Sequence, residues 1–500
     1  MRKYTKISSI LLIFFFFFSY LQLSNNSQAD NSKDYSPLTI TGDLRYVNGI
    51  YGSGAPTYLG GIQYMCNWGN YIFVSASTDL SGDRITIVNI TNPISPTIAG
   101  TVSTLTHNPR SSDVSSDGNY LFLASGNLGA SVQGALLIFN VTDKANPSYM
   151  GDYHLPAGQY QCAGCAYVDS TKVCYVACWG TTGNALYAIN CSDKTNPTFI
   201  SILAGCSYPH DVWANATRAI TIGHNNIVSG QATTIDVTDP TAMSIMDTYT
   251  TDRLAHPSLT RGFDIYYNEG QYAYFSSGGE ATENNGGLFI FDVSDFSNIQ
   301  PVSNISRFNY GNSSLNDFSS IFTNDYETIL YGISTWSDEP YNVFWVFDIT
   351  NKSNPVLISN LSGAGPPNYL GGNGDGAAFY KNPYSYIGLY ADKGISIFQF
   401  NETSNKPQFL SIQGGSNGTI LYNATPMFNW SKVNGTARYQ LQISTDASFS
   451  SIIVNLTDIC ENLYPSQYDE NATRVSFTLP SSSALPTYNR YYCRARALYA

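Results

Sequence analysis

The sequence predicts an all-β protein, in which a seven-bladed β-propeller of four-stranded antiparallel blades precedes a C-terminal β-sandwich module. Three observations predict this fold. A motif of a strand and a turn occurs seven times, a second strand pattern precedes each copy, and no helical periodicity separates them. The chain also contains enough Ile, Val, Phe and Tyr to build large cores from sheets.

The repeated motif is an apolar strand, a polar turn and a further strand, as in LFIFDVSDFSNIQPV at residues 288–302. The residue that begins the turn in the seven copies is Asn89, Asn140, Asn190, Asp236, Asp292, Asp348 and Gln399. These positions are 46 to 56 residues apart, within or slightly above the period of propeller blades. Because Asp or Asn accepts a hydrogen bond from the backbone two residues on, we interpret the motif as scaffold rather than as a binding motif.

Each motif belongs to a larger unit of four strands. A strand pattern such as NYIFVSAS, from Asn70, precedes it, and a weaker apolar segment such as HDVWA lies before that. Four short strands joined by turns rich in Gly, Asn and Asp make one antiparallel blade. Proline lies seven residues after the turn residue in four copies, at Pro96, Pro147, Pro197 and Pro355. We expect these prolines at an outer edge strand, where a missing N–H does no harm.

This pattern resembles the LVIVD repeat of extracellular bacterial and archaeal propeller proteins. The resemblance depends on Asp/Asn-Val/Ile-Ser/Thr-Asp/Asn after a hydrophobic strand, then a spacer with Asn-Pro, and it extends over residues 60–413. It implies a β-propeller exported to the cell surface, in a family without a well-defined common activity. The fourth copy lacks the Asn-Pro and the seventh replaces Asp with Gln399, so we expect their outer strands to depart from the pattern.

Residues 1–29 are typical of a secretory signal peptide. Arg2, Lys3 and Lys6 precede an apolar run over residues 10–21, and small residues suit cleavage between Ala29 and Asp30. The run is shorter than the roughly 20 residues that span a bilayer, although an uncleaved anchor remains the alternative. Nothing later in the chain is apolar for long enough to span a membrane. We therefore expect a secreted protein, or one on the outer face of the cell surface.

The segment before the first blade, residues 30–59, contains a further strand pattern at residues 36–45. Many propellers complete their last blade with such a segment, which joins the two ends of the ring. We therefore expect residues 36–45 to close the ring. The segment around Phe409 would then compete with it or become linker.

A second domain follows the propeller. Residues 414–423 are polar and rich in Gly and Asn, as in a linker. Residues 424–500 resemble a fibronectin type III or Ig-like module, with Trp430 and Tyr439 as expected core residues. No seventh strand follows Ala500, so we expect an incomplete module, which a continuing chain or a borrowed strand would complete.

Nine cysteines in an exported chain predict disulfides. Six of them are concentrated in the third repeat: Cys162, Cys165, Cys174, Cys178, Cys191 and Cys206. Two alternatives remain, a four-thiolate zinc site formed by the first four and free buried thiols. We expect Cys460 to pair with Cys493 in the C-terminal module. Cys66 is then left free or intermolecular.

Asn-x-Ser/Thr sequons are abundant, and they predict a glycoprotein. Those at Asn89, Asn140 and Asn190 coincide with the repeated turn, where the side chain serves the turn. The sequons that we expect to carry glycans are at Asn417, Asn423, Asn434, Asn455 and Asn471.

Acidic residues recur at the start of the first strand of several repeats. They are Asp113, Asp211, Asp264 and Asp317, and Asp375 lies close to the corresponding point in the seventh. First strands line the central channel of a propeller, so these carboxylates are candidates for a Ca²⁺ site, and no other cofactor is predicted. The alternative is that each Asp accepts N–H groups of the neighbouring blade. His107, His210 and His256 lie near the same ends, but at unequal offsets.

The sequence contains no HExxH, P-loop, GxSxG or EF-hand motif. A net charge of −12 argues against a nucleic-acid partner. We expect a non-enzymatic scaffold or adhesion protein that binds an extracellular protein or carbohydrate, in a surface-layer or matrix role. The alternative is a metal-dependent hydrolase or oxidoreductase with its site at the channel mouth.

Two observations would separate these classes. Histidines and carboxylates that converge at one end of the channel would favour the enzyme. An exposed tyrosine-rich face would favour adhesion, and the tyrosines considered for it are Tyr266, Tyr267, Tyr272, Tyr369, Tyr380 and Tyr384.

Overall fold

The computed structural model describes residues 41–498. The gaps are 53–58, 77–82, 106–107, 127–132, 181–182, 226–228, 251–260, 279–285, 307–309, 311–314, 316–317, 326, 335–341, 363–375, 390–393, 404–408, 413–424, 432–437, 446–451, 461–462, 465, 471–473 and 486–490. The predicted signal peptide with Ala29 and Asp30, and the predicted linker at 414–423, lie outside the described residues. Two compact units divide the chain, one of residues 43–401 and one that contains residues 402–500.

The larger unit is a β-propeller. Its described residues form seven antiparallel sheets of four strands each, numbered here in chain order. Sheet 1 contains β2 (Ile62–Trp68), β3 (Tyr71–Ala76), β4 (Asp83–Asn89) and β5 (Thr97–Leu105). Sheet 2 contains β6 (Asn108–Val114), β7 (Tyr120–Gly126), β8 (Ala135–Asn140) and β9 (Ser148–His154). Sheet 3 contains β10 (Gln159–Val168), β11 (Val173–Gly180), β12 (Gly183–Asn190) and β13 (Thr198–Ala204).

The remaining sheets follow the same order. Sheet 4 contains β14 (Pro209–Ala214), β15 (Arg218–Asn225), β16 (Ser229–Asp236) and β17 (Ser244–Thr250). Sheet 5 contains β18 (Arg261–Tyr267), β19 (Tyr272–Gly278), β20 (Gly287–Asp292) and β21 (Gln300–Ile305). Sheet 6 contains β22 (Phe318–Thr323), β23 (Ile329–Ser334), β24 (Val343–Asp348) and β25 (Val356–Ser362). Sheet 7 contains β26 (Gly376–Lys381), β27 (Tyr384–Leu389), β28 (Gly394–Thr403) and β1 (Thr41–Tyr51).

The sheets form a ring around their first strands. Each first strand contacts the next, from β2 to β26, and β26 contacts β2 again. The cores lie between neighbouring sheets. One cluster joins Phe73 and Ile87 of sheet 1 to Leu121 and Phe139 of sheet 2, and other clusters join later neighbours in the same way. A single sheet cannot bury both of its apolar faces, so stability depends on stacking around the ring.

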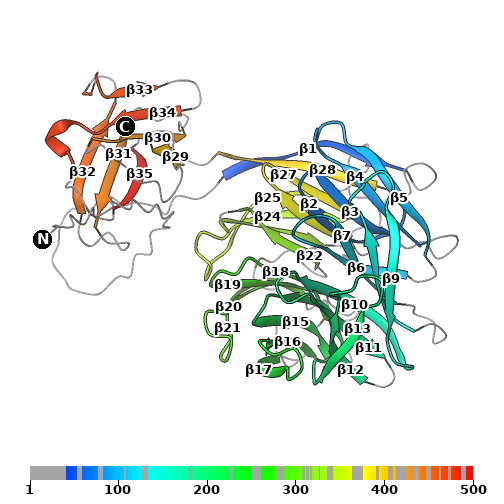
Figure 1. The fold of residues 1–500 in the computed structure, drawn as a ribbon. Coiled ribbons are helices and arrows are strands. Elements are labelled where there is room, and N and C mark those ends of the chain that lie inside the picture. The colour runs from blue at the N-terminus through cyan, green and yellow to red at the C-terminus, as the bar shows by residue number, and fades with distance from the viewer. Residues whose placement is uncertain are drawn as a thin grey trace, which may run out of the picture. The chain divides into compact units, whose positions relative to one another are not determined.

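The ring closes through β1. This strand pairs with β28, and the blue and yellow ribbons lie side by side in Figure 1. The closing strand is therefore residues 41–51, farther along the chain than the expected 36–45. The segment around Phe409 neither competes for this place nor acts as linker, because it forms β29 (Phe409–Ile412) in the other unit. Sheet 7 is already complete without it.

The repeated turn has the hydrogen bonding expected from its sequence. The side-chain Oδ1 accepts the backbone N–H two residues on in six copies, which begin at Asn89, Asn140, Asn190, Asp236, Asp292 and Asp348. Gln399 is different, because its Oε1 accepts a hydrogen bond from Arg45 Nη2 of β1 at 2.6 Å. The fourth strand of sheet 7 comes from the N-terminal side, so no tight reversal is needed after Gln399.

The outer strands agree with the proline positions. Pro96, Pro147, Pro197 and Pro355 each lie one residue before the outer strand of their sheet. Sheet 4 forms its outer strand β17 although the fourth copy lacks Asn-Pro, because the Asp236 and Asp239 turns still reverse the chain.

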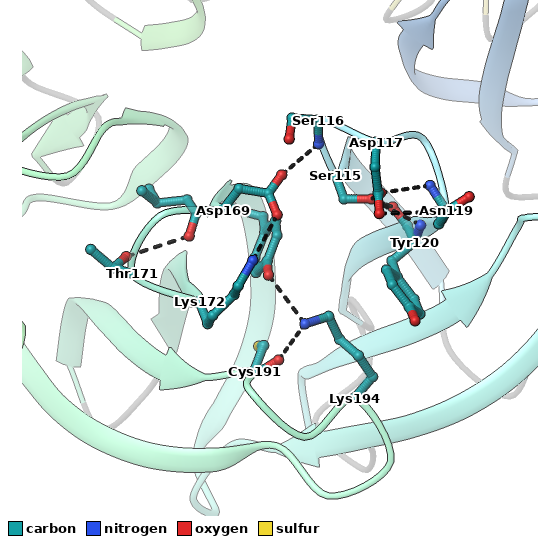
Figure 2. Close-up of polar contacts among 12 residues, drawn as sticks. Ser115, Ser116, Asp117, Asn119, Tyr120, Asp169, Thr171, Lys172, Cys191 and Lys194 are labelled. Atoms are coloured by element: carbon teal, nitrogen blue, oxygen red, sulfur yellow. Dashed lines mark hydrogen bonds and ion pairs between the residues drawn. The ribbon is translucent and has the colours of Figure 1, made fainter.

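Lysines after the turn connect neighbouring sheets, which the sequence did not reveal. Lys194 points toward the carbonyl oxygen of Cys191 in Figure 2, and its Nζ donates to that oxygen at 2.5 Å. The same Nζ donates to the Tyr167 hydroxyl at 3.1 Å. It also lies 5.3 Å from the ring centroid of Tyr120 in sheet 2. Asp169, in the same view, accepts the backbone N–H of Ser116 at 2.5 Å. These contacts attach sheet 3 to sheet 2.

The C-terminal unit has two sheets around one core. One sheet contains β29, β30 (Met427–Ser431), β34 (Arg474–Thr478) and β33 (Tyr468–Glu470), and the other contains β32 (Ile452–Ile459), β31 (Arg438–Ser444) and β35 (Tyr492–Leu498). A 3₁₀ turn spans Ser481–Ser483. Trp430 and Tyr439 are fully buried as expected, with ring centroids 5.6 Å apart. β29 (Phe409–Ile412) belongs to this unit, although the sequence predicts a module that begins at residue 424.

None of the described helical segments is long and apolar enough to cross a membrane.

Candidate ligand site in the central channel

A bulge in the first strands directs side chains into the channel. The register of β10 against β11 shifts at two points, the second of them between Cys162 and Gly164. A shift that corresponds to this second one occurs once in β2, β6, β14, β18 and β22. The residues at these shifts are Gln63, Arg110, Ala163, His210, Phe263 and Ser319. A bulge inserts an extra residue and re-aims its side chain, so these six positions share one orientation.

These side chains line a cavity of about 310 Å³. Every sheet contributes to it. The lining residues are Gln63, Tyr64, Met65, Arg110, Gln161, Ala163, Trp179, His210, Asp211, Phe263, Asp264, Ser319, Ser320, Ala377 and Ala378. Cavities of this size are at the small end of ligand-binding pockets.

Two carboxyl groups meet in the cavity. Asp211 directly follows the bulge of β14, Asp264 lies at the bulge of β18, and the two carboxyl groups interact. Burial raises the pKa of Asp264 to about 6, and burial with the neighbouring Asp264 charge raises the pKa of Asp211 well above its ordinary value. Two interacting buried carboxyl groups titrate as a unit, and the pair retains a proton at higher pH than an exposed Asp.

The strand position of Asp211 and Asp264 also connects sheets 4 to 7 through hydrogen bonds. Asp211 Oδ2 accepts the backbone N–H of Ile265 at 3.1 Å. Asp264 Oδ2 accepts the hydroxyl of Ser320 at 2.7 Å and the N–H of Ile321 at 3.0 Å. Ser320 Oγ in turn accepts the N–H of Ala378 at 3.2 Å. These bonds hold both carboxyl groups in fixed positions. They agree with the alternative to the Ca²⁺ site, in which each Asp accepts N–H groups of the neighbouring blade.

Several polar atoms in the cavity wall are buried and lack a partner among the described residues. They are Nε2 of Gln161, Nε1 of Trp179 and Oγ of Ser319. The Gln161 residue is 3 % exposed and Ser319 is 8 % exposed. A buried polar group without a partner costs about 1–3 kcal/mol, so these atoms are suited to bind a ligand.

Aromatic rings form one side of the site. His210 lies 6.2 Å from Trp179, 5.5 Å from Phe263 and 5.1 Å from His224 between ring centroids. Tyr208 stacks on His224 at 5.0 Å, and its backbone φ is +34°, in the region that favours glycine. Strained backbone of this kind concentrates at functional sites.

The predicted Ca²⁺ residues do not form a ring of equivalent carboxylates. Ser111, not Asp113, matches Asp211 in register, so Asp113 lies two residues farther along its strand. Asp113 Oδ2 accepts the N–H of Tyr167 in sheet 3 at 2.7 Å, and burial raises its pKa to about 6. Asp317 and Asp375 lie outside the described residues, as do His107 and His256. Within the described part of the chain, no three His, Cys, Asp or Glu side chains are placed to share a metal.

The structure places the cysteines but does not test the predicted disulfides, which remain a prediction. All nine are thiols in this structure, including Cys460 and Cys493. Cys162, Cys165, Cys174, Cys178 and Cys191 share the core between sheets 2 and 3, whereas Cys206 lies in the core between sheets 3 and 4. Cys162 and Cys178 are direct partners across β10 and β11, with their Sγ atoms 3.3 Å apart. Cys66 is also a thiol, 3.4 Å from the Ser112 hydroxyl.

The tyrosines considered for an adhesive face are mainly packing residues. Tyr266 and Tyr272 pack against the core of sheets 5 and 6, and Tyr384 against that of sheets 7 and 1. Tyr267 contacts Trp213, and Tyr380 stacks on Tyr331 at 5.7 Å. Tyr369 lies outside the described residues. Long aromatic side chains are needed to fill the wide gaps between sheets.

The predicted glycosylation sites are mainly outside the described residues, namely Asn417, Asn423, Asn434 and Asn471. Asn455 is exposed on β32, where its Oδ1 accepts hydrogen bonds from Gln440 and Gln442.

Sequence reasoning missed Gln161, Trp179, Ser319 and the bulge itself. A bulge breaks the alternation of inward and outward side chains, so spacing along the chain does not reveal which residues face the channel. Alignment of the first strands on the residue before Asp211 would have placed His210, Phe263 and Ser319 in one column.

Comparisons with known proteins agree with this architecture. Residues 68–104 match the LVIVD repeat. No curated protein matches the chain at a significant level. Among solved structures, hydrazine synthase of Kuenenia stuttgartiensis is 13% identical with a TM-score of 0.50, over 70% of this chain and 98% of that one. The periplasmic gluconolactonase PpgL of Pseudomonas aeruginosa is 14% identical with a TM-score of 0.48, over 60% and 85%.

A third similar structure is that of the RRP9 WD40 repeats, 12% identical with a TM-score of 0.48, over 72% of this chain and 100% of that one. At 13% identity, the likeness to the hydrazine synthase shows the fold and not the activity. The LVIVD match and the ring of four-stranded sheets show that the chain is a β-propeller repeat protein.

Proposed function

We propose that this protein is an exported, non-enzymatic binding protein whose propeller holds a small ligand in the central cavity. One observation carries the proposal: the cavity wall contains buried polar atoms of Gln161, Trp179 and Ser319 that have no partner among the described residues. A wall designed only for packing would be apolar or internally paired. This moves the expected binding surface from the outer loops to the channel.

Export is part of the same proposal. The basic and apolar N-terminal segment, the small residues before Asp30 and the many sequons support it. Expression in a secreting host should give a mature chain that begins at Asp30 and loses mass on enzymatic deglycosylation. An intact N-terminus and no mass loss would contradict export and glycosylation.

The architecture that we propose is a complete ring of seven blades followed by a fibronectin type III-like module. The seven described sheets and the contact between β26 and β2 support the ring. In the C-terminal unit, the described strands form two sheets that share the core around Trp430, which supports the module. We propose that the module acts as a spacer or contact domain at the cell exterior.

The test is a binding screen with a variant that fills the cavity. Ala163 lines the cavity, so Ala163→Phe should abolish binding of any ligand found in a screen of small metabolites and glycans. Ala145 is exposed in a turn, so Ala145→Phe is the matched control and should bind normally. Binding that survives in Ala163→Phe would place the ligand elsewhere and reject the channel site.

A second candidate is a hydrolase, because Asp211 and Asp264 form an interacting carboxyl pair and His210 lines the same cavity. Paired carboxyl groups with separated pKa values are a recurrent acid and base arrangement. A panel of ester, glycoside and lactone substrates tests it. Turnover that falls at least a hundredfold in Asp264→Asn would support the hydrolase, and equal turnover in both proteins would reject it.

A further inference from the structure

The acidic side of the cavity presents carboxyl oxygens in fixed positions. Asp211 and Asp264 are held by backbone N–H groups of sheets 5 and 6, so their oxygens keep fixed positions. Among the described residues, no lysine or arginine is a main influence on the pKa of either carboxyl group. Arg110 also lines the cavity, and its Nη1 donates to Oε1 of Gln63 at 3.0 Å. Burial makes any charge on the carboxyl pair costly.

The third sheet supplies the opposite kind of group. Nε2 of Gln161 and Nε1 of Trp179 are hydrogen-bond donors that line the same cavity without a partner among the described residues. Gln161 pairs with Trp179 in the register of β10 and β11, so the two donors lie side by side. Both require an acceptor atom on a bound molecule.

Aromatic rings complete the wall. Tyr64, Trp179 and Phe263 line the cavity. Burial raises the pKa of Tyr64, and so do the charges of Asp211 and Asp264, which line the same cavity. An ammonium group between carboxylates and aromatic faces gains both ion pairing and cation–π attraction.

We propose that the cavity binds a small primary amine that also carries a hydrogen-bond acceptor, with its ammonium group at Asp211 and Asp264 and its acceptor at Gln161 and Trp179. This rests on the proposed function, because it names the ligand class of the same cavity. The volume of about 310 Å³ suits a molecule of amino-acid or amino-sugar size.

Binding of an ammonium group should release a proton. The carboxyl pair retains a proton because of burial and mutual repulsion, and a bound cation favours full ionisation. The other titratable or charged groups that line the cavity are Tyr64, Arg110 and His210, and Asp113 influences Tyr64 from β6. Proton release that is lost in Asp264→Asn would assign the change to the pair.

The experiment compares probes that differ only in the amine. D-Glucosamine and D-glucose, and ethanolamine and ethylene glycol, are titrated into the full chain by calorimetry at pH 7. Each amine should bind at least tenfold more tightly than its neutral partner. Equal affinities, binding of the neutral members alone, or no binding of either amine at 10 mM would overturn the inference.

Two isosteric variants test the site. Asp211→Asn and Asp264→Asn should lose at least tenfold in amine affinity. Asp113→Asn is the matched control, because Asp113 bonds to the next sheet in the same way but does not line the cavity, and it should bind normally. If the Asp variants fail to fold, Trp179→Phe removes one donor and keeps an aromatic wall, and an unchanged affinity for glucosamine would contradict the donor assignment.

The two proposals can fail separately. A neutral ligand that is blocked by Ala163→Phe would retain the channel binding site and reject the amine. An amine that binds Ala163→Phe as tightly as the unmodified chain would reject both.

Discussion

Asp211 and Asp264 occupy the same position of neighbouring blades, and their buried carboxyl groups interact in the central cavity. The same groups accept backbone N–H groups of the next sheet, so they are at once structural links and the acidic side of the candidate site. A group with both roles affects stability and binding together. The control Asp113 separates these effects, because it has only the structural role among the described contacts.

The buried carboxyl groups predict that stability falls as pH rises. The pKa of Asp264 and of Asp113 is raised to about 6, so each favours folding fully below the unfolded value near 4 and loses this contribution as pH rises through 6. The effect is at most about 3 kcal/mol for each group. Thermal unfolding should therefore give a higher Tm at pH 5 than at pH 8. Asp264→Asn should flatten this dependence, and an identical pH profile in the variant would contradict the assignment.

Cys162 and Cys178 are the thiols best placed to form a disulfide. They are opposite each other on β10 and β11, and their Sγ atoms are 3.3 Å apart. We expect protein secreted under oxidising conditions to carry this link, with a mass 2 Da lower than the dithiol and resistance to thiol alkylation without reductant. Peptide mapping identifies the partners. Cys162→Ser should free Cys178 for alkylation after unfolding. A disulfide between Cys178 and another cysteine in the unmodified chain would show that the predicted pairing is wrong.

Lys352 should stabilise the contact between sheets 5 and 6. Its Nζ donates to the carbonyl oxygens of Glu327 at 2.7 Å and Ile349 at 3.0 Å, and lies 5.5 Å from the Tyr272 ring centroid. Lys352→Met leaves both carbonyl groups without this donor, so we expect a loss of about 1–3 kcal/mol in unfolding free energy. Lys172 has only an exposed ion pair with Asp169, so Lys172→Met should change stability by less than about 0.5 kcal/mol. Equal losses in denaturant titrations of the two variants would argue against a special role for Lys352.

Gly164 should not tolerate a side chain. A Cβ atom there would lie 2.7 Å from Cα of Asp211, because the backbone of sheet 4 lies close to this glycine, which directly follows the bulge of β10. Gly164→Ala should push these strands apart and destabilise the propeller by about 1–3 kcal/mol. It should also displace Asp211, so ligand affinity should fall with stability. A variant with unchanged Tm would show that the strands separate at no cost.

Local pattern was sufficient for the blades. The motif around Asp292 predicts a strand, a turn and an edge strand from the chemistry of a few adjacent residues, and the structure has the expected hydrogen bond at this turn. Repetition made the pattern reliable, because the same local solution occurs along the chain. The resemblance of residues 424–500 to a fibronectin type III or Ig-like module also predicted Trp430 and Tyr439 as core residues, and both are buried.

The site and the ring closure depended on contacts between distant segments. The cavity contains residues from Gln63 to Ala378, and their convergence requires both the ring and the bulges that break strand alternation. Likewise, the sequence around Gln399 departs from the repeated turn. In the structure, Gln399 accepts a hydrogen bond from Arg45, because the fourth strand of sheet 7 is β1, from the N-terminal side of the chain. The side chains of residues that are adjacent in the sequence are thus enough to specify each blade. The channel, in contrast, forms only when seven sheets pack around it, so the sequence of a single blade does not determine it.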